Sequence, residues 1–383
     1  MRFMGLGRWQ GGSIGLATVA LTLGTVIAPV AANASNGRVA GTSEFDYPTG
    51  LAFGGGHLWV TNKANDSVTE INPANGAWIR TLSHSNGYRF NEPIAITRNG
   101  ANLFIANAGD SITEIAAGNG KLVRVISGAR FRFANPVAIT STGNTMLVLN
   151  TGRASGSITE FNARTGSFLR TVSGGKFAFD HPQALTVSGA NVFVADEGND
   201  SVTEVKVANG SLVRIIAGQG LDAPDGIAVA IGNVWVADAG SNAATDINAT
   251  TGAVIATYSD SDGAYGFGQP SSVIAAQGNV YVMTPYSTSP MVTKVGATNG
   301  TPYWFMCNTN GPYYFSDLSA FAVSGNDLWV ASRTGDNSQT PAAKTGALTE
   351  MTITDGSLIA TYPSPNATPA TTTTVPSTTT TAP

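Results

Sequence analysis

The chain has 383 residues, with 20 Lys and Arg against 24 Asp and Glu, so its formal net charge is −4. Only 11% of its residues are charged, which argues against nucleic acid or an acidic lipid surface as a natural partner. The 42% hydrophobic content excludes global disorder, and the single Cys, Cys307, excludes a disulfide framework or a multi-cysteine metal site.

The first 34 residues have the pattern of an export signal. Arg2 and Arg8 supply positive charge, residues 13–32 form an uncharged apolar run, and Ala32-Asn33-Ala34 matches an A-x-A cleavage site. A transmembrane anchor is the alternative, because the run is about 20 residues long. We favour cleavage, which predicts a protein that is secreted or associated with the cell envelope and keeps no membrane span.

Residues 35–362 contain one sequence unit that is repeated seven times. A Pro or its substitute recurs every 42–48 residues, and a large apolar residue follows each of these anchors by eleven positions. The anchors are Pro48, Pro93, Pro136, Pro182, Pro224, Pro270 and Leu318. The residues eleven positions later are Trp59, Phe104, Leu147, Phe193, Trp235, Tyr281 and Trp329. A fixed period of this length indicates a repeat architecture.

Each unit holds four short strand patterns separated by Gly and Asn turns, and no amphipathic helix is evident. Seven such units predict an all-β fold, a seven-bladed β-propeller of four-stranded antiparallel blades. The residue two places after each anchor is small, as the crowded innermost strand requires. These residues are Gly50, Ala95, Ala138, Ala184, Gly226, Ser272 and Ala320. How the ring closes around residues 37–45 is left open.

Four units place a Glu ten residues before an Arg, with a Gly turn between them. The pairs are Glu70/Arg80, Glu114/Arg124, Glu160/Arg170 and Glu204/Arg214. A three-residue loop would set each Glu opposite its Arg across the last hairpin. We interpret them as exposed cross-strand pairs, each worth about 0–1 kcal/mol.

The line Phe-x-x-Pro-x-(Gly/Ala)-(Ile/Leu) followed by (Trp/Phe)-Val-Ala-(Asp/Asn) resembles NHL repeats, best at residues 179–196 and 221–238. Trp59-Val60-Thr61-Asn62 is similar to the related YVTN repeats. The resemblance implies a propeller fold. Propellers of this group include extracellular binding domains and, more distantly, the streptogramin (virginiamycin B) lyases, which act through a His and a metal at one mouth of the channel.

The predicted second strands end in polar residues, among them Asp196 and Asp238. A Ca²⁺ or Mg²⁺ site of oxygen ligands is one interpretation, and capping of tight turns is the one we favour. His84, His181 and Glu197 lie in loops on the same face. A His beside an acid would suit general-base chemistry, so these residues carry the alternative of a metal-assisted lyase or hydrolase.

Aromatic residues recur five positions before the anchors, with basic residues beside them. We predict a binding surface for a protein, peptide or glycan, because aromatic rings stack on sugars and peptides. Its residues are Tyr88, Phe131, Phe177, Tyr265, Tyr313, Arg130 and Arg132. Longer connections at 284–291 and 332–346 lie on the same face, where insertions often mark a binding face.

Residues 363–383 consist mainly of Pro, Thr, Ser and Ala, which predicts an extended tail. Together these features favour an exported, non-enzymatic propeller of the cell envelope, expected as a monomer without a cofactor. The lyase remains the alternative. A purely structural, self-associating envelope protein is a third possibility.

Overall fold

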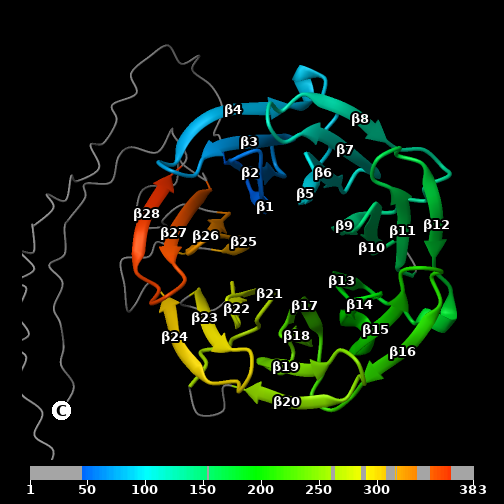
Figure 1. Cartoon of the computed structure of the whole chain (residues 1–383), viewed down its shortest axis with the longest axis vertical. Coiled ribbons are helices and arrows are strands. Elements are labelled where there is room, and N and C mark those ends of the chain that lie inside the picture. Colours follow the sequence, from blue (N-terminus) through cyan, green and yellow to red (C-terminus); the bar gives the residue numbers. More distant parts are fainter. Residues whose placement is uncertain are drawn as a thin grey trace, which may run out of the picture. The chain divides into compact units, whose positions relative to one another are not determined.

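The structure is a computed structural model, and it describes residues 45–152, 155–259, 264–285, 290–307, 315, 317–333 and 346–363. Within these ranges the strands form seven four-stranded antiparallel sheets arranged around a central opening (Figure 1). The predicted all-β, seven-bladed propeller is therefore confirmed. Three short 3-10 turns accompany the strands: η1 (His84–Asn86), η2 (Gly175–Phe177) and η3 (Glu197–Asn199).

Each blade runs from an innermost strand outward in chain order. The innermost strands are β1 (Pro48–Gly54), β5 (Pro93–Asn99), β9 (Pro136–Thr142), β13 (Pro182–Ser188), β17 (Pro224–Ala230), β21 (Ser272–Ala276) and β25 (Leu318–Ser324). The second strands are β2 (His57–Asn62), β6 (Asn102–Asn107), β10 (Thr145–Asn150), β14 (Asn191–Asp196), β18 (Asn233–Asp238), β22 (Asn279–Thr284) and β26 (Asp327–Ser332).

The third and outermost strands complete the blades. The third strands are β3 (Ser67–Asn72), β7 (Ser111–Ala116), β11 (Ser157–Asn162), β15 (Ser201–Lys206), β19 (Ala243–Asn248), β23 (Met291–Gly296) and β27 (Ala347–Thr352). The outermost strands are β4 (Ala77–Ser83), β8 (Leu122–Ile126), β12 (Phe168–Val172), β16 (Leu212–Ala217), β20 (Val254–Ser259), β24 (Pro302–Cys307) and β28 (Leu358–Pro363).

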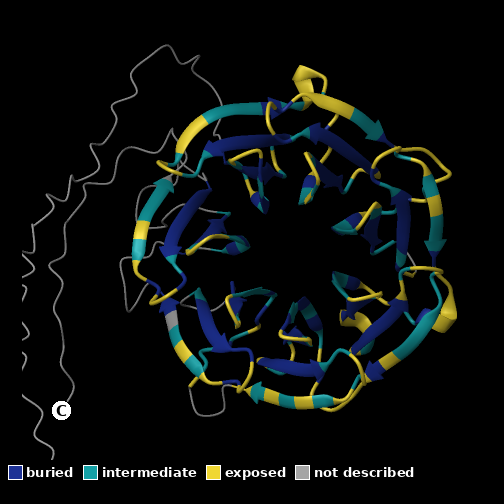
Figure 2. Ribbon diagram, in the orientation of Figure 1, coloured by how far each residue is buried: buried dark blue, intermediate teal, exposed yellow. Residues whose placement is uncertain are grey.

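The core lies between neighbouring blades, in the second and third strands (Figure 2). All seven large residues that follow the anchors by eleven are at most 1% exposed. A single blade has two apolar faces, so it needs a neighbour on each side to remove them from water. This requirement explains why the repeat is so regular on the strands that face other blades.

The small residue of the innermost strand is required by the close approach of the next blade. A Cβ atom added at Gly226 would lie 2.5 Å from the Cα atom of Ser272 and 2.8 Å from the carbonyl oxygen of Ser271. Both of these atoms belong to backbone, which cannot turn away as a side chain can.

We expect Gly226→Ala to destabilise the protein by roughly 1–3 kcal/mol, as overpacking does elsewhere. Gly118→Ala is the matched control, because a Cβ atom there meets no atom within 4 Å. Urea denaturation of both variants measures the difference. Equal midpoints for the two variants would show that the blades are not packed this closely.

The Glu–Arg pairs are not exposed pairs, so that interpretation is wrong. The register opposes each Glu to its Arg, as Glu204 to Arg214, but the four Glu side chains are only 0–1% exposed, because the next blade covers them. Each Arg also donates to a backbone carbonyl in the following blade. The acceptors are Asn119, Arg164, Ala208 and Thr250 for Arg80, Arg124, Arg170 and Arg214.

The other three junctions use different side chains of the two outer strands. Tyr258 of blade 5 lies against Gly300 of blade 6, where an added Cβ atom would come within 1.9 Å of the Tyr258 ring. Lys294 of blade 6 donates to the carbonyl of Ile353 in blade 7 at 2.8 Å. Tyr362 of blade 7 lies against Gly76 of blade 1, where an added Cβ atom would come within 1.9 Å of the Tyr362 ring. A side chain near the rim therefore ties each blade to the next.

The ring closes by packing between complete blades. In the described residues, blade 7 takes all four of its strands from residues 318–363 and blade 1 takes its own from residues 48–83. Phe45 enters the core between these two blades, and its carbonyl accepts a hydrogen bond from the amide of Gly346 at 2.8 Å.

The predicted export signal (1–34) lies outside the described residues, and so does the predicted tail apart from Pro363, the last residue of β28. The two long connections are described only at their ends. Among the described residues, no helix has the length and apolar character needed to cross a membrane.

Candidate functional site

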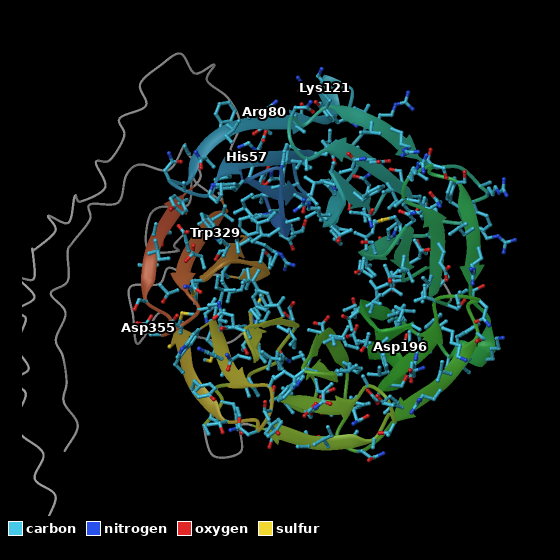
Figure 3. The ribbon with its side chains drawn as sticks, in the orientation of Figure 1. His57, Arg80, Lys121, Asp196, Trp329 and Asp355 are labelled. Atoms are coloured by element: carbon cyan, nitrogen blue, oxygen red, sulfur yellow. The ribbon has the colours of Figure 1, made fainter. Side chains whose placement is uncertain are left out.

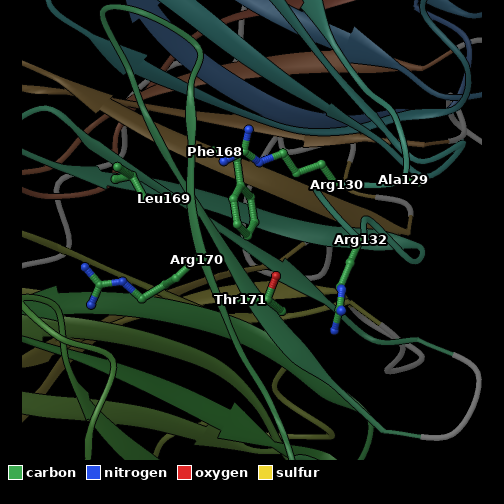
Figure 4. A pocket seen from close by; sticks show the side chains of 7 residues that line it. All are labelled: Ala129, Arg130, Arg132, Phe168, Leu169, Arg170 and Thr171. Atoms are coloured by element: carbon green, nitrogen blue, oxygen red, sulfur yellow. The ribbon is translucent and has the colours of Figure 1, made fainter.

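A groove lies at the outer edge of blade 3, where the loop from blade 2 passes along β12 (Figure 4). It has a volume of about 590 Å³. The loop contributes Ala129, Arg130 and Arg132, and the strand contributes Phe168, Leu169, Arg170 and Thr171. Both arginines predicted to bind a ligand thus line one groove.

Arg130 and Arg132 are exposed, and no carboxylate of the described residues pairs with either of them. The Arg130 guanidinium lies over the Phe168 ring, 5.4 Å from its centroid. An aromatic face attracts a cation and limits its motion, so Phe168 holds this guanidinium in place. Exposed guanidinium groups without a carboxylate partner favour carboxylate, sulfate or phosphate as the ligand group.

Arg170, the third cation of the groove, is tied to Glu160 behind it. Its Nε lies 3.3 Å from the Glu160 carboxylate, and the Glu160 side chain is only 1% exposed. Burial raises the pKa of Glu160 to about 7, against the opposing effect of Arg170. A carboxyl group this deep and this weakly acidic offsets little of the positive charge that faces the solvent.

The predicted aromatic residues lie between the blades. Tyr88, Phe131, Phe177 and Tyr265 stack on the aromatic residues two positions later, with centroids 5.2–5.6 Å apart. Phe177 is only 3% exposed, which removes its face from a ligand's reach. Phe131 packs edge-on against Phe168 at 5.9 Å and so supports the floor of the groove. Tyr313 lies outside the described residues.

Asp196 and Asp238 lie inside their blades and not at an open ring (Figure 3 shows Asp196). Each is 0% exposed. Thr203 donates to Asp196 at 2.9 Å, just as Asn107 and Asn150 bond to Thr113 and Thr159 in blades 2 and 3. Burial raises the pKa of Asp196 to about 8 and that of Asp238 to about 7. Protonated carboxyls enclosed in protein are poor cation ligands.

The histidine and acid candidates do not form one cluster. His84 Nδ1 lies 2.7 Å from the carbonyl of Phe90, which belongs to the same loop. His181 is largely exposed and pairs with Asp180 at 2.8 Å. Glu197 accepts a hydrogen bond from Gln183. Among the described residues, no three His, Cys, Asp or Glu side chains lie close enough together to hold a metal ion.

Glu197 does have an acidic neighbour, which sequence reasoning missed. Asp225 sits at the irregularity between Pro224 and Gly226 in the innermost strand β17. Burial, and to a smaller extent Glu197, raise its pKa to about 7 against the lowering effect of Arg333 of blade 7. The signal in the sequence was the position after the anchor, where only Asp225 is charged. Its counterparts are Thr49, Ile94, Val137, Gln183, Ser271 and Ser319.

Solved propellers share this fold at low sequence identity. A catalytically inactive variant of virginiamycin B lyase from Staphylococcus aureus, solved with quinupristin, superposes with a TM-score of 0.62 and 13% identity, over 76% of this chain and 94% of the lyase. The computationally designed protein Ika8 gives a TM-score of 0.60 at 15% identity, over 84% and 88% of the two chains.

BamB from Moraxella catarrhalis gives a TM-score of 0.50 at 13% identity, over 75% of this chain and 83% of BamB. These likenesses show the propeller fold alone. No protein-family model and no curated protein sequence matches the chain. The NHL and YVTN repeat type stays a prediction.

Proposed function

We propose that the protein is an exported, non-enzymatic propeller that binds an anionic group of its ligand in the Arg130–Arg132 groove. The carrying observation is that two exposed guanidinium groups, which pair with no carboxylate in the part of the chain that the structure describes, line one groove beside an aromatic side chain. A guanidinium group that pairs with no carboxylate keeps its hydrogen-bond donors for an anion of another molecule. The ligand is a protein, peptide or glycan that carries carboxylate, sulfate or phosphate.

The test is calorimetric titration with galacturonate at low ionic strength, with galactose as the uncharged control. Loss of charge-assisted hydrogen bonds in Arg130→Ala/Arg132→Ala should weaken galacturonate binding by more than about tenfold. Arg89→Ala is the matched variant, because Arg89 and Arg132 both lie four residues before an anchor with φ of 54° and 52°. Unchanged affinity in the double variant, or an equal loss in Arg89→Ala, contradicts the proposal.

A second candidate, a lyase at the channel opening, is favoured by Asp225 alone. A carboxyl group with a pKa of about 7 beside Glu197 has the acidity that proton transfer near neutral pH requires. Quinupristin is the substrate to test, because the similar lyase was solved with it. If the protein converts quinupristin, Asp225→Asn should abolish turnover and Arg130→Ala should leave turnover unchanged. Absence of turnover by the unmodified protein removes this candidate.

A further inference from the structure

The charges of this chain are divided between the two halves of the ring. Residues 80–214 hold 13 of the 20 Lys and Arg and 9 of the 24 Asp and Glu. Residues 215–363 hold 3 basic and 11 acidic residues. A net charge of −4 therefore conceals a basic half in blades 2–4 and an acidic half in blades 5–7, and such asymmetry points to a charged partner.

The outer edge of the basic half is more positive than its composition implies. Its strand carboxylates Glu114, Glu160, Asp196 and Glu204 are only 0–1% exposed. The arginines paired with three of them remain 28–32% exposed. The solvent therefore meets guanidinium groups, while the compensating carboxylates lie behind them.

We call this edge the basic rim and define it by Lys121, Arg124, Arg130, Arg132, Arg164, Arg170, Lys206 and Arg214. The contacts place its members in succession from blade to blade. Arg124 reaches the turn that carries Arg164, donating to its carbonyl at 2.8 Å. Arg170 lines the groove with Arg130 and Arg132 and donates to Ala208, just beyond Lys206, at 3.1 Å. Arg214 continues the series toward blade 5.

We infer that the ligand is a linear anionic glycan that runs along the basic rim of blades 2–4, with the groove as its tightest contact. This inference rests on the proposed function and adds the class of ligand. One small anion can occupy the groove, but only a chain with repeated charges meets cations that recur once per blade. Single exposed pairs are weak and screened by salt, so a rim of this kind binds through their number.

The edge strands themselves argue against an acidic peptide that binds as an added strand. An added peptide strand needs a regular edge, and the pairing of each outer strand is irregular at the same point in blades 2, 3 and 4. Such bulges block strand addition. A glycan needs no backbone pairing and contacts the rim through its carboxylates or phosphates alone.

The experiment compares monomer with polymer for two anion sources, using the full chain. Galacturonate is set against polygalacturonate, and glycerol phosphate against poly(glycerol phosphate). At least one polymer should bind about tenfold tighter than its monomer, and its affinity should fall steeply with salt. The better polymer identifies the anion. Tighter binding of polyglutamate or single-stranded DNA than of both glycans overturns the inference.

The matched variants each remove two cations. Arg164→Ala/Lys206→Ala lies on the rim outside the groove and should reduce polymer affinity about five- to tenfold while leaving monomer affinity unchanged. Lys63→Ala/Arg98→Ala, away from the rim, should leave both unchanged. Equal affinity for monomer and polymer overturns the inference of a polymeric ligand and leaves the proposed anion site in the groove standing. Absence of binding by every anion overturns both proposals.

Discussion

Arg214→Ala should lower the free energy of unfolding by roughly 2–4 kcal/mol, far more than loss of a surface ion pair. Arg214 Nε lies 2.7 Å from the carboxylate of Glu204, which is 0% exposed. Its Nη2 also donates to Thr250 of blade 5 at 3.0 Å. Removal of the Arg leaves a buried carboxylate with one remaining partner, the Asn191 amide. The cost is below that of a fully buried pair because Arg214 is 31% exposed.

Urea denaturation measures this loss, and a second substitution isolates its cause. Glu204→Gln in the Arg214→Ala background removes the unpaired charge, so most of the stability should return. Blade 5 shows the arrangement without an Arg: Ala256 faces Asp246, Asn233 donates to its carboxyl group, and burial raises the pKa of Asp246 to about 6. If the free energy of unfolding of Arg214→Ala lies within about 0.5 kcal/mol of that of the parent protein, as for ordinary surface substitutions, the account of the blade junctions is contradicted.

Asp196→Asn should stabilise the protein at pH 8 by about 2–3 kcal/mol. Burial raises the pKa of Asp196 from 3.8 to about 8, and each pKa unit corresponds to about 1.4 kcal/mol, part of which the desolvated amide gives back. Blades 1–3 already hold Asn at this place, where its amide donates to Ser and Thr on the third strand. Ser201 and Thr203 supply the same acceptors in blade 4.

The sign of the pH dependence follows from the same group. Between about pH 4 and pH 8 the folded Asp196 keeps a proton that the unfolded chain has lost, so stability falls as pH rises through this window. Asp238, Asp225 and Glu160, each with a pKa near 7, act in the same direction. Melting temperature should be higher at pH 5 than at pH 8, and Asp196→Asn should reduce the difference. The same difference in both proteins would contradict this account.

The fold could be predicted from the sequence because the repeat places the same residue types at positions where every blade has the same packing requirement. The packing of the innermost strand requires the anchor and the small residue two positions later. The core between blades requires the large residue eleven positions after the anchor. These constraints recur seven times, so they survive variation in any one unit. Even the opposition of Glu to Arg followed from the hairpin, since a turn length fixes a register.

Contacts between blades could not be read in this way. Arg214, the partner of Glu204, also donates to the carbonyl of Thr250, which belongs to another repeat. The groove combines Arg130 with Phe168, 38 residues later, and no local pattern joins them. Phe177 is predicted to contact a ligand, yet the η2 turn and the positive φ of Ala178 let its ring stack on Phe179. Asp225 was missed because its role depends on the neighbouring blade.

The central claim is that Arg130 and Arg132 bind an anion in the groove. Its most direct test is an NMR titration of the full chain with galacturonate that follows the arginine Nε–Hε signals. The account predicts saturable shifts of Arg130 and Arg132, with those of Arg89 and Arg98 unmoved. Shifts of equal size for all exposed arginines, or none at saturating ligand, would contradict it.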